Sequence, residues 1–275
     1  MQPALSIREV GEAVSRARTG AAEYCTNFFP SPQKLQGWIS HGELFCDERA
    51  GVAFFLRKDR GFWHLYFCAA DPATLQRALT TLPILGTDPI VLDLVGKEAE
   101  LARLIALFEA AGWHIYNRLF RMARTVTAAA AAAPGTPDSR VVVADRAEVP
   151  AILDLLLRSF DCRAEQIPML YEVEAAAAAG QIWVARYAGG LAGLLFFETQ
   201  GFSSLLRYWL VAPELRTQRL GSALMRRYLA EQPAVRRFLL WVAASNPEAI
   251  VKYEHFDFAR EGLVDYVFAN DRIRP

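Results

Sequence analysis

In the second half of the chain, short apolar runs typical of strands alternate with segments whose apolar residues recur at helical spacing. This pattern predicts alternating strands and helices. Residues 181–213 carry short apolar runs broken by Gly189-Gly190, a pattern typical of a β-hairpin followed by a further strand. Residues 147–160 and 221–232 carry apolar side chains at helical spacing instead. In order, residues 140–270 predict β-α-α-β-β-β-α-β-α-β. This is a mixed, mostly antiparallel sheet flanked by helices, of the α/β or α+β class.

The first half of the chain repeats this order. Residues 43–70 predict three strands, followed by helix, strand, helix and strand up to residue 124. Phe108 precedes Tyr253 by 145 residues, and Ile90 precedes Phe238 by 148, at corresponding places of the two patterns. A nearly constant offset indicates an internal duplication. The alternative is two unrelated α/β domains with a similar rhythm.

The clearest break between the halves is a run of six alanines, residues 128–133, followed by PGTPDS. Two prolines, a glycine and small polar residues end any helix that the alanines begin. We therefore predict one domain over residues 1–125, a linker over 126–139 and a second domain over 140–275.

Composition narrows the class of protein. Of 275 residues, 53% are hydrophobic and 22% charged, as in folded globular proteins, and the net charge is zero, which disfavours a dedicated nucleic-acid binder. No apolar run reaches the ~18 residues of a membrane span, and the N-terminus lacks the apolar stretch of a signal peptide. The four cysteines show neither CxxC pairing nor metal spacing, so we expect reduced thiols, no metal site and a cytoplasmic protein.

The stretch LVAPELRTQRLGSALM, residues 210–225, carries the candidate chemistry. A strand ends in a loop with Arg216 and Arg219, and a helix begins near Gly221. The first turn of a helix has unpaired N–H groups and a positive dipole end, so it attracts phosphate. An ordinary strand-to-helix connection is the alternative. The matching turn of the first half, residues 70–79, is shorter and has neither glycine nor arginine before its helix.

This loop resembles the acyl-CoA pyrophosphate loop of the GNAT superfamily of N-acyltransferases, whose pattern is V-x-P followed by R/Q-x-x-G-x-G/A. The matching residues are Val211, Pro213, Arg216 and Gly221, while Arg219 replaces the first glycine. The segment ASNPEAIVKYEHFDF resembles the family's N-x-x-A-x-x-x-Y-x-x-x-G-F. Here the matches are Asn246, Ala249, Tyr253 and Phe258, and Asp257 replaces the glycine. The resemblance covers about residues 140–270 and implies tandem GNAT-like domains, the first degenerate, with Phe108 in place of Tyr253.

The resemblance implies transfer of an acetyl or similar acyl group from acetyl-CoA, as acyl-donor cosubstrate, to a primary amine by direct attack. The backbone of Trp209, Leu210 and Val211 would pair with the pantetheine arm. The pyrophosphate would lie against Arg216, Thr217, Gln218, Arg219, Leu220, Gly221, Ser222 and Ala223. Asn246 would contact the arm or a water, or simply cap the helix. A non-catalytic acyl-CoA-binding or regulatory module is the alternative function, and an unrelated phosphate-ester binder is a third.

The resemblance also implies an acid and a base. Tyr253 is the expected acid for the leaving thiolate, unless it only packs in the core. Glu198 is our candidate base, although a water relay would need none, and Asp161, Glu165 and Glu172 lie where the acceptor pocket is expected. We expect a small-molecule amine as the acceptor, with no nucleic-acid or membrane partner. The first domain would wall off the acceptor pocket or offer a partner surface, a homodimer included.

Overall fold

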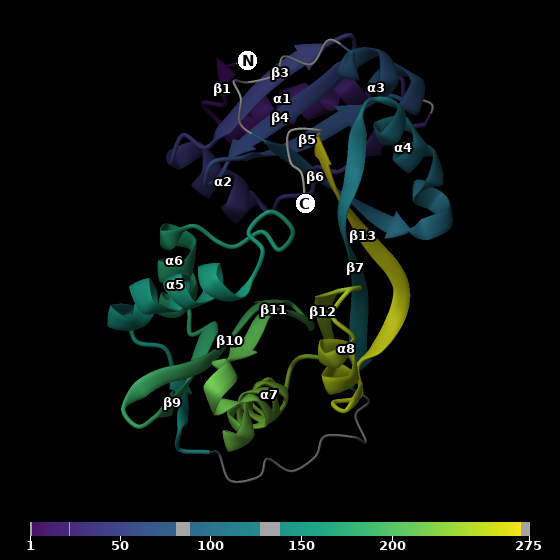
Figure 1. Cartoon of the computed structure of the whole chain (residues 1–275). Helices are drawn as coiled ribbons and strands as arrows, with labels where there is room; N and C mark the ends of the chain where they lie inside the picture. The colour runs from purple at the N-terminus through teal and green to yellow at the C-terminus, as the bar shows by residue number, and fades with distance from the viewer. Residues whose placement is uncertain (1, 22, 81–88, 127–137, 271–275) are drawn as a thin grey trace. The chain divides into compact units, whose positions relative to one another are not determined.

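The computed structural model describes residues 2–21, 23–80, 89–126 and 138–270. It comprises two compact units (Figure 1). Unit 1 contains Met1–Leu119 and Gly262–Pro275, and unit 2 contains Phe120–Glu261. Most of the predicted linker, residues 127–137 of 126–139, lies outside the described residues. The domain ranges 1–125 and 140–275 stay a prediction about the two halves of the sequence.

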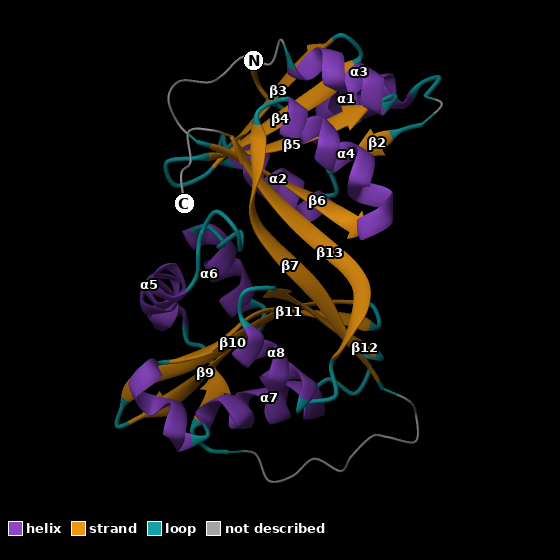
Figure 2. Cartoon of the chain, turned by 45° about the vertical axis from the view of Figure 1, so that its right-hand side comes forward, coloured by secondary structure: helices purple, strands orange, loops and turns teal. Residues whose placement is uncertain are grey.

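Unit 1 is a mixed sheet with helices packed on it (Figure 2). Its strand order is β1-β3-β4-β5-β6-β13, with β2 beside β5, and only β5 and β6 pair in parallel. The strands are β1 (Gln2–Pro3), β2 (Cys25–Thr26), β3 (Leu44–Arg49), β4 (Val52–Lys58), β5 (Trp63–Ala69), β6 (Ile90–Lys97) and β13 (Ala259–Asn270). The helices are α1 (Ile7–Arg18), α2 (Pro32–Ser40), α3 (Pro72–Leu79) and α4 (Glu98–Ala110).

Three helices of unit 1 begin at capping side chains. Ser6, Ser31 and Asp71 accept hydrogen bonds from backbone N–H groups in the first turns of α1, α2 and α3. The central strands β4 and β5 are buried along almost their whole length, which is why they appear in the sequence as apolar runs. The predicted hairpin of β3 and β4 is present.

Unit 2 repeats the mixed sheet in the order β7-β12-β11-β10-β9-β8, with β11 and β12 parallel. Its strands are β7 (Trp113–Thr125), β8 (Val141–Val143), β9 (Ile182–Tyr187), β10 (Gly190–Gln200), β11 (Ser203–Val211) and β12 (Arg237–Ala243). Its helical elements are η2 (Arg146–Glu148), α5 (Val149–Ser159), α6 (Leu170–Ala178), η3 (Pro213–Gln218), α7 (Leu220–Ala230) and α8 (Pro247–Glu254). One apolar core lies between the sheet and α7 and α8, and another includes α5 and α6. The predicted mixed sheet flanked by helices is confirmed.

Two strands are divided between the units. Strand β7 runs from unit 1 into unit 2 at Leu119–Phe120, and β13 runs from unit 2 into unit 1 at Glu261–Gly262. Within unit 1, Leu263–Ala269 of β13 pairs with Lys97–Val91 of β6. Each half of the sequence therefore contributes part of its last strand to the unit built mainly from the other half. The periodicity of the sequence does not reveal this exchange.

The α-helices run from 8 to 13 residues. In the part of the chain that the structure describes, none has the length and apolar character that crossing a bilayer requires.

Candidate acyl-CoA site

Strands β11 and β12 of unit 2 part from each other in mid-sheet. They pair from Ser203–Arg237 to Leu206–Leu240, and then β11 continues to Val211 while β12 ends at Ala243. The opposite edge of β11 stays paired with β10 as far as Val211–Gly193. Since pairing with β12 stops at Leu206, the edge of β11 after that residue offers backbone hydrogen-bonding groups to a ligand. This segment includes Trp209, Leu210 and Val211, the residues predicted to meet the pantetheine arm.

The parting begins at a β-bulge. Phe196 lies opposite Tyr208 and Phe197 opposite Leu206, so Arg207 is an extra residue in β11. A bulge bends a strand and increases its twist, which turns the end of β11 away from its former direction. Gly193 lets the backbones stay close beyond the bulge, because a Cβ atom there would lie 2.6 Å from the carbonyl oxygen of Leu210.

The predicted phosphate loop follows β11 as η3 and leads into α7. Arg219 precedes the helix with φ of 58° and ψ of 16°, a left-handed conformation that glycine adopts without steric cost. This explains why the GNAT pattern has a glycine there. The side chains of Arg216 and Arg219 are exposed, and within the described ranges neither makes an ion pair. Their charge is therefore available to an anion at the N-terminus of α7.

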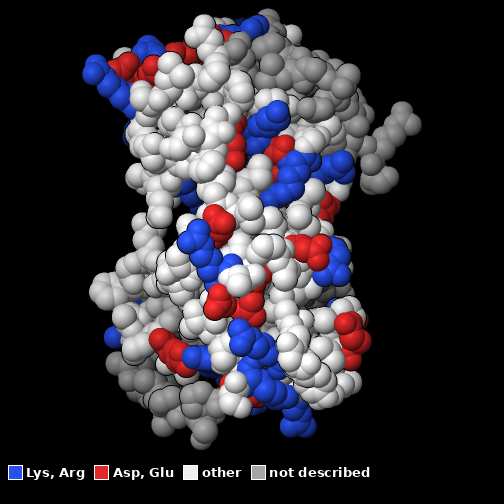
Figure 3. All heavy atoms as spheres, turned by 90° about the vertical axis from the view of Figure 1, so that its left-hand side faces the viewer, with Lys and Arg blue, Asp and Glu red and all other residues white. Residues whose placement is uncertain are grey.

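A third arginine, Arg140, supports the loop and was missed in the sequence analysis. Its Nη1 donates to the carbonyl oxygen of Gln218 at 3.4 Å, while Nε and Nη2 donate to Asp138 at 3.0 and 2.7 Å. Arg140 precedes Gln218 by 78 residues, so no local pattern connects them. Figure 3 shows Lys and Arg side chains close together on the visible face of unit 2, with Asp and Glu side chains beside them.

Trp209 connects the start of α7 to α8. Its Nε1 donates to the carbonyl oxygen of Gly221 at 3.1 Å, and its ring lies 5.4 Å from that of Tyr253. A Cβ atom at Gly221 would meet the Trp209 ring at 3.4 Å and the Val211 side chain at 3.5 Å. The glycine therefore makes room for the indole as well as keeping the start of the helix small.

The second predicted segment forms α8. The Oδ1 of Asn246 accepts from the N–H of Ala249 at 3.1 Å, so the helix-capping role is present. Asp257, where the pattern has its other glycine, has φ of 62°. Tyr253 is 9% exposed, and burial raises the pKa of its phenol above the ordinary value, with a further increase from the Glu165 carboxylate. A phenol in this setting is protonated at neutral pH and is a weaker acid than an ordinary tyrosine.

Glu198, the candidate base, is occupied by an ion pair. Its Oε1 accepts from Nη1 of Arg207 at 2.6 Å, and the Arg207 side chain is only 15% exposed. The Glu198 carboxylate thus neutralises a largely buried guanidinium. The role of Glu198 as base stays a prediction, and this geometry gives its carboxylate a structural role.

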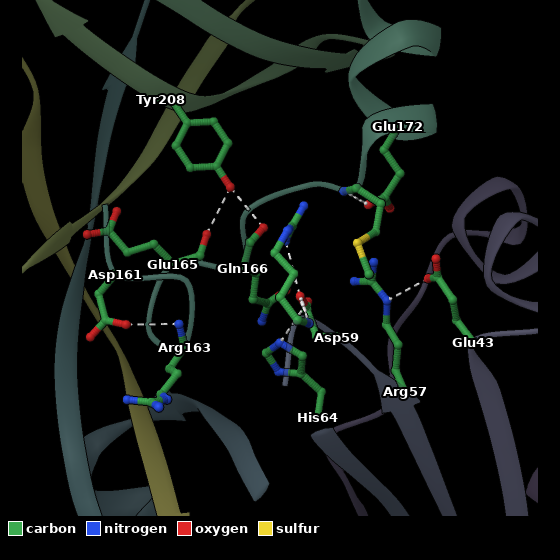
Figure 4. A network of polar contacts seen from close by, with 12 residues as sticks. Glu43, Arg57, Asp59, His64, Asp161, Arg163, Glu165, Gln166, Glu172 and Tyr208 are labelled. Carbon is green, nitrogen blue, oxygen red and sulfur yellow. Dashed lines mark hydrogen bonds and ion pairs between the residues drawn. The ribbon is translucent and has the colours of Figure 1, made fainter. Parts of the chain in front are cut away.

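The segment between α5 and α6 is fastened to β11. The hydroxyl of Tyr208 donates to the carbonyl oxygens of Glu165 and Gln166 at 2.9 and 2.8 Å (Figure 4), and Nη2 of Arg207 donates to that of Gln166 at 3.2 Å. Gln166 has a left-handed φ of 45°. Burial raises the pKa of the half-buried Glu165 to about 7, and Asp161 adds to the effect. In the sequence, Glu165 was only one of several acidic residues near the expected pocket.

The other two acidic residues of this region cap backbone N–H groups. Oδ1 of Asp161 accepts from the N–H of Arg163 at 2.9 Å, and Oε2 of Glu172 accepts from the N–H of Met169 at 2.7 Å. Both carboxylates therefore fix the local course of the chain.

Among the described residues of unit 1, the turn before α3 differs from the loop before α7. Asp71 directly precedes α3, and its carboxylate accepts from the N–H and hydroxyl of Thr74 at 2.8 and 2.9 Å. A carboxylate thus occupies the helix N-terminus and would repel a phosphate. Phe108, the counterpart of Tyr253, is fully buried against Phe67 and Phe268.

Comparison with known proteins agrees with this geometry. Residues 178–260 match the family model described as Acetyltransferase (GNAT) domain. No curated protein matches the sequence. A solved tandem GNAT protein from the clavulanic acid biosynthesis pathway is 14% identical, with a TM-score of 0.63, and the alignment covers 99% of this chain and 98% of that one.

Two further solved structures extend along nearly the whole chain. A Drosophila protein is 16% identical with a TM-score of 0.58, and 98% of each chain is covered. A GNAT-family acetyltransferase from Colwellia psychrerythraea is 14% identical with a TM-score of 0.54, and 96% of each chain is covered. At these identities the likeness concerns the fold.

Proposed function

We propose that this chain, in which residues 178–260 form a GNAT acetyltransferase domain, transfers an acetyl or similar acyl group from acetyl-CoA to a primary amine. The observation that carries the proposal is the parting of β11 and β12 immediately before an arginine-bearing helix N-terminus. The edge of β11 beyond the parting offers backbone pairing to an extended arm. The N-terminus of α7 offers N–H groups and positive charge to phosphates. We place the acceptor among small molecules.

The residues fit CoA along its length. The edge of β11 from Trp209 to Val211 would pair with the pantetheine arm, and the first turn of α7 would receive the pyrophosphate. Arg216 and Arg219, both exposed, would contact its oxygens. Bound there, the cosubstrate supplies an activated acyl thioester.

Transfer requires two proton movements that the protein must assist. A base takes one proton from the acceptor ammonium, and the free amine nitrogen bonds to the acyl carbon as the carbon–sulfur bond breaks. Tyr253 gives its proton to the departing sulfur, and the second proton lost by the nitrogen restores the phenol. The balance is one amide, one free thiol and one proton released to solvent.

Ligand-dependent thermal stability tests this proposal directly. We expect acetyl-CoA and CoA at about 100 times their Kd to stabilise the protein by about 2.7 kcal/mol, which raises the melting midpoint by a few degrees. ATP and NAD share the phosphates but lack pantetheine, and they should give smaller shifts. Equal shifts with ATP and acetyl-CoA would instead indicate a general phosphate-ester binder.

The substitution Tyr253→Phe separates an enzyme from a binding module. It removes only a hydroxyl and keeps the ring against Trp209, so folding and acetyl-CoA affinity should change little. Loss of the proton donor should lower kcat by about 10²-fold. The measurement is thiol release from acetyl-CoA with a panel of amines, beside the Kd of acetyl-CoA. An unchanged kcat would remove Tyr253 from the chemistry.

A further inference from the structure

The parting of β11 and β12 leaves one question about the chemistry open, namely which group accepts the ammonium proton. A base must lie near the acid, carry a carboxylate that is not already paired, and titrate near the working pH. Of the acidic candidates, Glu198 is paired with Arg207, and Asp161 and Glu172 accept from backbone N–H groups.

Glu165 meets these conditions. It is half-buried, and in the described part of the chain its carboxylate makes neither a hydrogen bond nor an ion pair. It lies close enough to Tyr253 to raise the pKa of that phenol. Figure 4 shows its carboxylate directed away from the Tyr208 hydroxyl, toward the side on which the Asp161 carboxylate lies.

The backbone of Glu165 is fixed from the sheet. The Tyr208 hydroxyl donates to the carbonyl oxygens of Glu165 and Gln166. The Arg207 guanidinium also donates to the carbonyl oxygen of Gln166. Gln166 keeps a left-handed backbone, a conformation of a non-glycine residue that persists only where its surroundings enforce it. Tyr208 is itself 2% exposed. Its ring packs against Phe160 and Phe196, and its hydroxyl orients the backbone of residues 165–166.

We propose that Glu165 is the general base that takes the proton from the acceptor ammonium, and that Tyr208 is its positioning residue. The inference rests on the acyl transfer proposed above. The ammonium gives its proton to the Glu165 carboxylate, the amine nitrogen then attacks, and the carboxyl group passes the proton to solvent.

The groups around Glu165 determine the pH at which it works. The pKa of Glu165 is raised to about 7, mainly by burial and in smaller part by the nearby charge of Asp161. Tyr208 of β11 and Tyr253 of α8 also lie within its electrostatic reach, and both are neutral phenols near pH 7 because burial raises their pKa values. The Arg207 guanidinium on β11 is already paired with Glu198.

The test compares Glu165→Gln with the control Asp161→Asn, which removes an equal charge from the same segment and keeps an oxygen for the N–H of Arg163. The probes are acetyl-CoA with benzylamine, spermidine, lysine and kanamycin. We expect Glu165→Gln to lower kcat by 10²–10⁴-fold near pH 7, with acetyl-CoA Kd unchanged within twofold. Asp161→Asn should keep kcat within about threefold and move the acidic limb of the pH profile to lower pH, because the charge that raises the pKa of Glu165 is gone.

Tyr208→Phe tests the positioning role while keeping the buried ring. It should lower kcat by about tenfold and also move the acidic limb to lower pH, since a looser segment exposes Glu165 to water. A residue that only supports the fold would leave that limb in place.

A readout on the free protein complements the kinetics. The folded pKa of about 7 lies above the ordinary value of 4.5, so the folded state binds more protons between these pH values. The melting midpoint of the wild type should therefore fall as pH rises from about 4.5 to 7, and Glu165→Gln should lack this part of the decline.

The outcomes are distinguishable. If the wild type transfers the acyl group and Glu165→Gln keeps its activity within twofold, the role of Glu165 as base is wrong and the proposed function stands. No transfer and no acetyl-CoA binding by the wild type would overturn the proposed function, and this inference with it.

Discussion

Two residues of unit 2, Arg219 and Asp257, hold a left-handed backbone where the GNAT pattern has glycine. Aspartate tolerates this conformation better than arginine does, because its short side chain bonds locally. The backbone geometry of the phosphate loop thus persists without its glycine. The cost of that conformation falls on Arg219, in exchange for one more positive charge beside the expected phosphates.

The substitution Arg219→Gly should therefore raise the free energy of unfolding by about 1 kcal/mol, because glycine takes φ of 58° without a Cβ clash. The control Arg219→Ala keeps the Cβ atom and should show no such gain. Both variants lose the same charge, so acetyl-CoA affinity should fall by a similar factor of about 3 to 10. Chemical denaturation and calorimetric titration measure the two effects. Equal stability of the glycine and alanine variants would contradict the strain argument.

At this scale the sequence was informative where the relevant residues are contiguous. Arg216, Gly221 and Asn246 lie in short motifs whose local structure follows from capping and helix-dipole physics. Arg140 and the contacts of Tyr208 with residues 165–166 depend on partners about 40 to 80 residues away. No one-dimensional pattern encodes such contacts. For the same reason the sequence did not reveal the ion pair between Glu198, the candidate base, and Arg207.

The N-terminus of α7 is the element on which the proposed phosphate binding depends. The substitution Ser222→Asp adds a negative charge in its first turn, and the matched control Ser222→Asn adds the same bulk without charge. The aspartate should stabilise the helix by about 0.3–1 kcal/mol through the dipole and lower acetyl-CoA affinity at least tenfold by repulsion. Melting curves and titrations with acetyl-CoA measure both. Retained affinity in Ser222→Asp would locate the pyrophosphate elsewhere.

The elements themselves were largely predictable. Strands β11 and β12 and helices α7 and α8 have periodic patterns because one face of each is buried, whereas β9 and β10 appear as apolar runs because consecutive residues are buried. Helices α1 and α2 were not predicted, since α1 buries only Val10, Ala13 and Ala17, and α2 buries only Leu35 and Trp38. The bulge at Arg207 was also unpredictable, because it exists only in the pairing of β11 with β10.

The whole molecule contains two units with similar mixed sheets and different helix N-termini. Unit 2 keeps an open helix N-terminus, whereas Asp71 fills that of unit 1 and Phe108 replaces the phenol. The expectation of a degenerate first domain without a pyrophosphate loop stays a prediction. The sequence did not predict that β7 and β13 are each divided between the units.

A cut within residues 127–137 tests the division of these strands. We expect the two fragments left by such a cut to stay together in native buffer, because part of each fragment's last strand belongs to the unit built mainly from the other fragment. Size-exclusion chromatography before and after cleavage measures this, with the same cleavage in denaturant as control. Elution of two separate fragments in native buffer would contradict the exchange.

The exchange also has a consequence for inheritance. A duplicated gene ordinarily leaves two copies that can be lost, shuffled or fused elsewhere one at a time. Here β13, encoded at the end of the second copy, completes pairing with β6 of the first. Deleting the first half would leave the final strand of the second half without its partner β6. The first half would then be retained for the strand β6 that it supplies to the last strand of the second half.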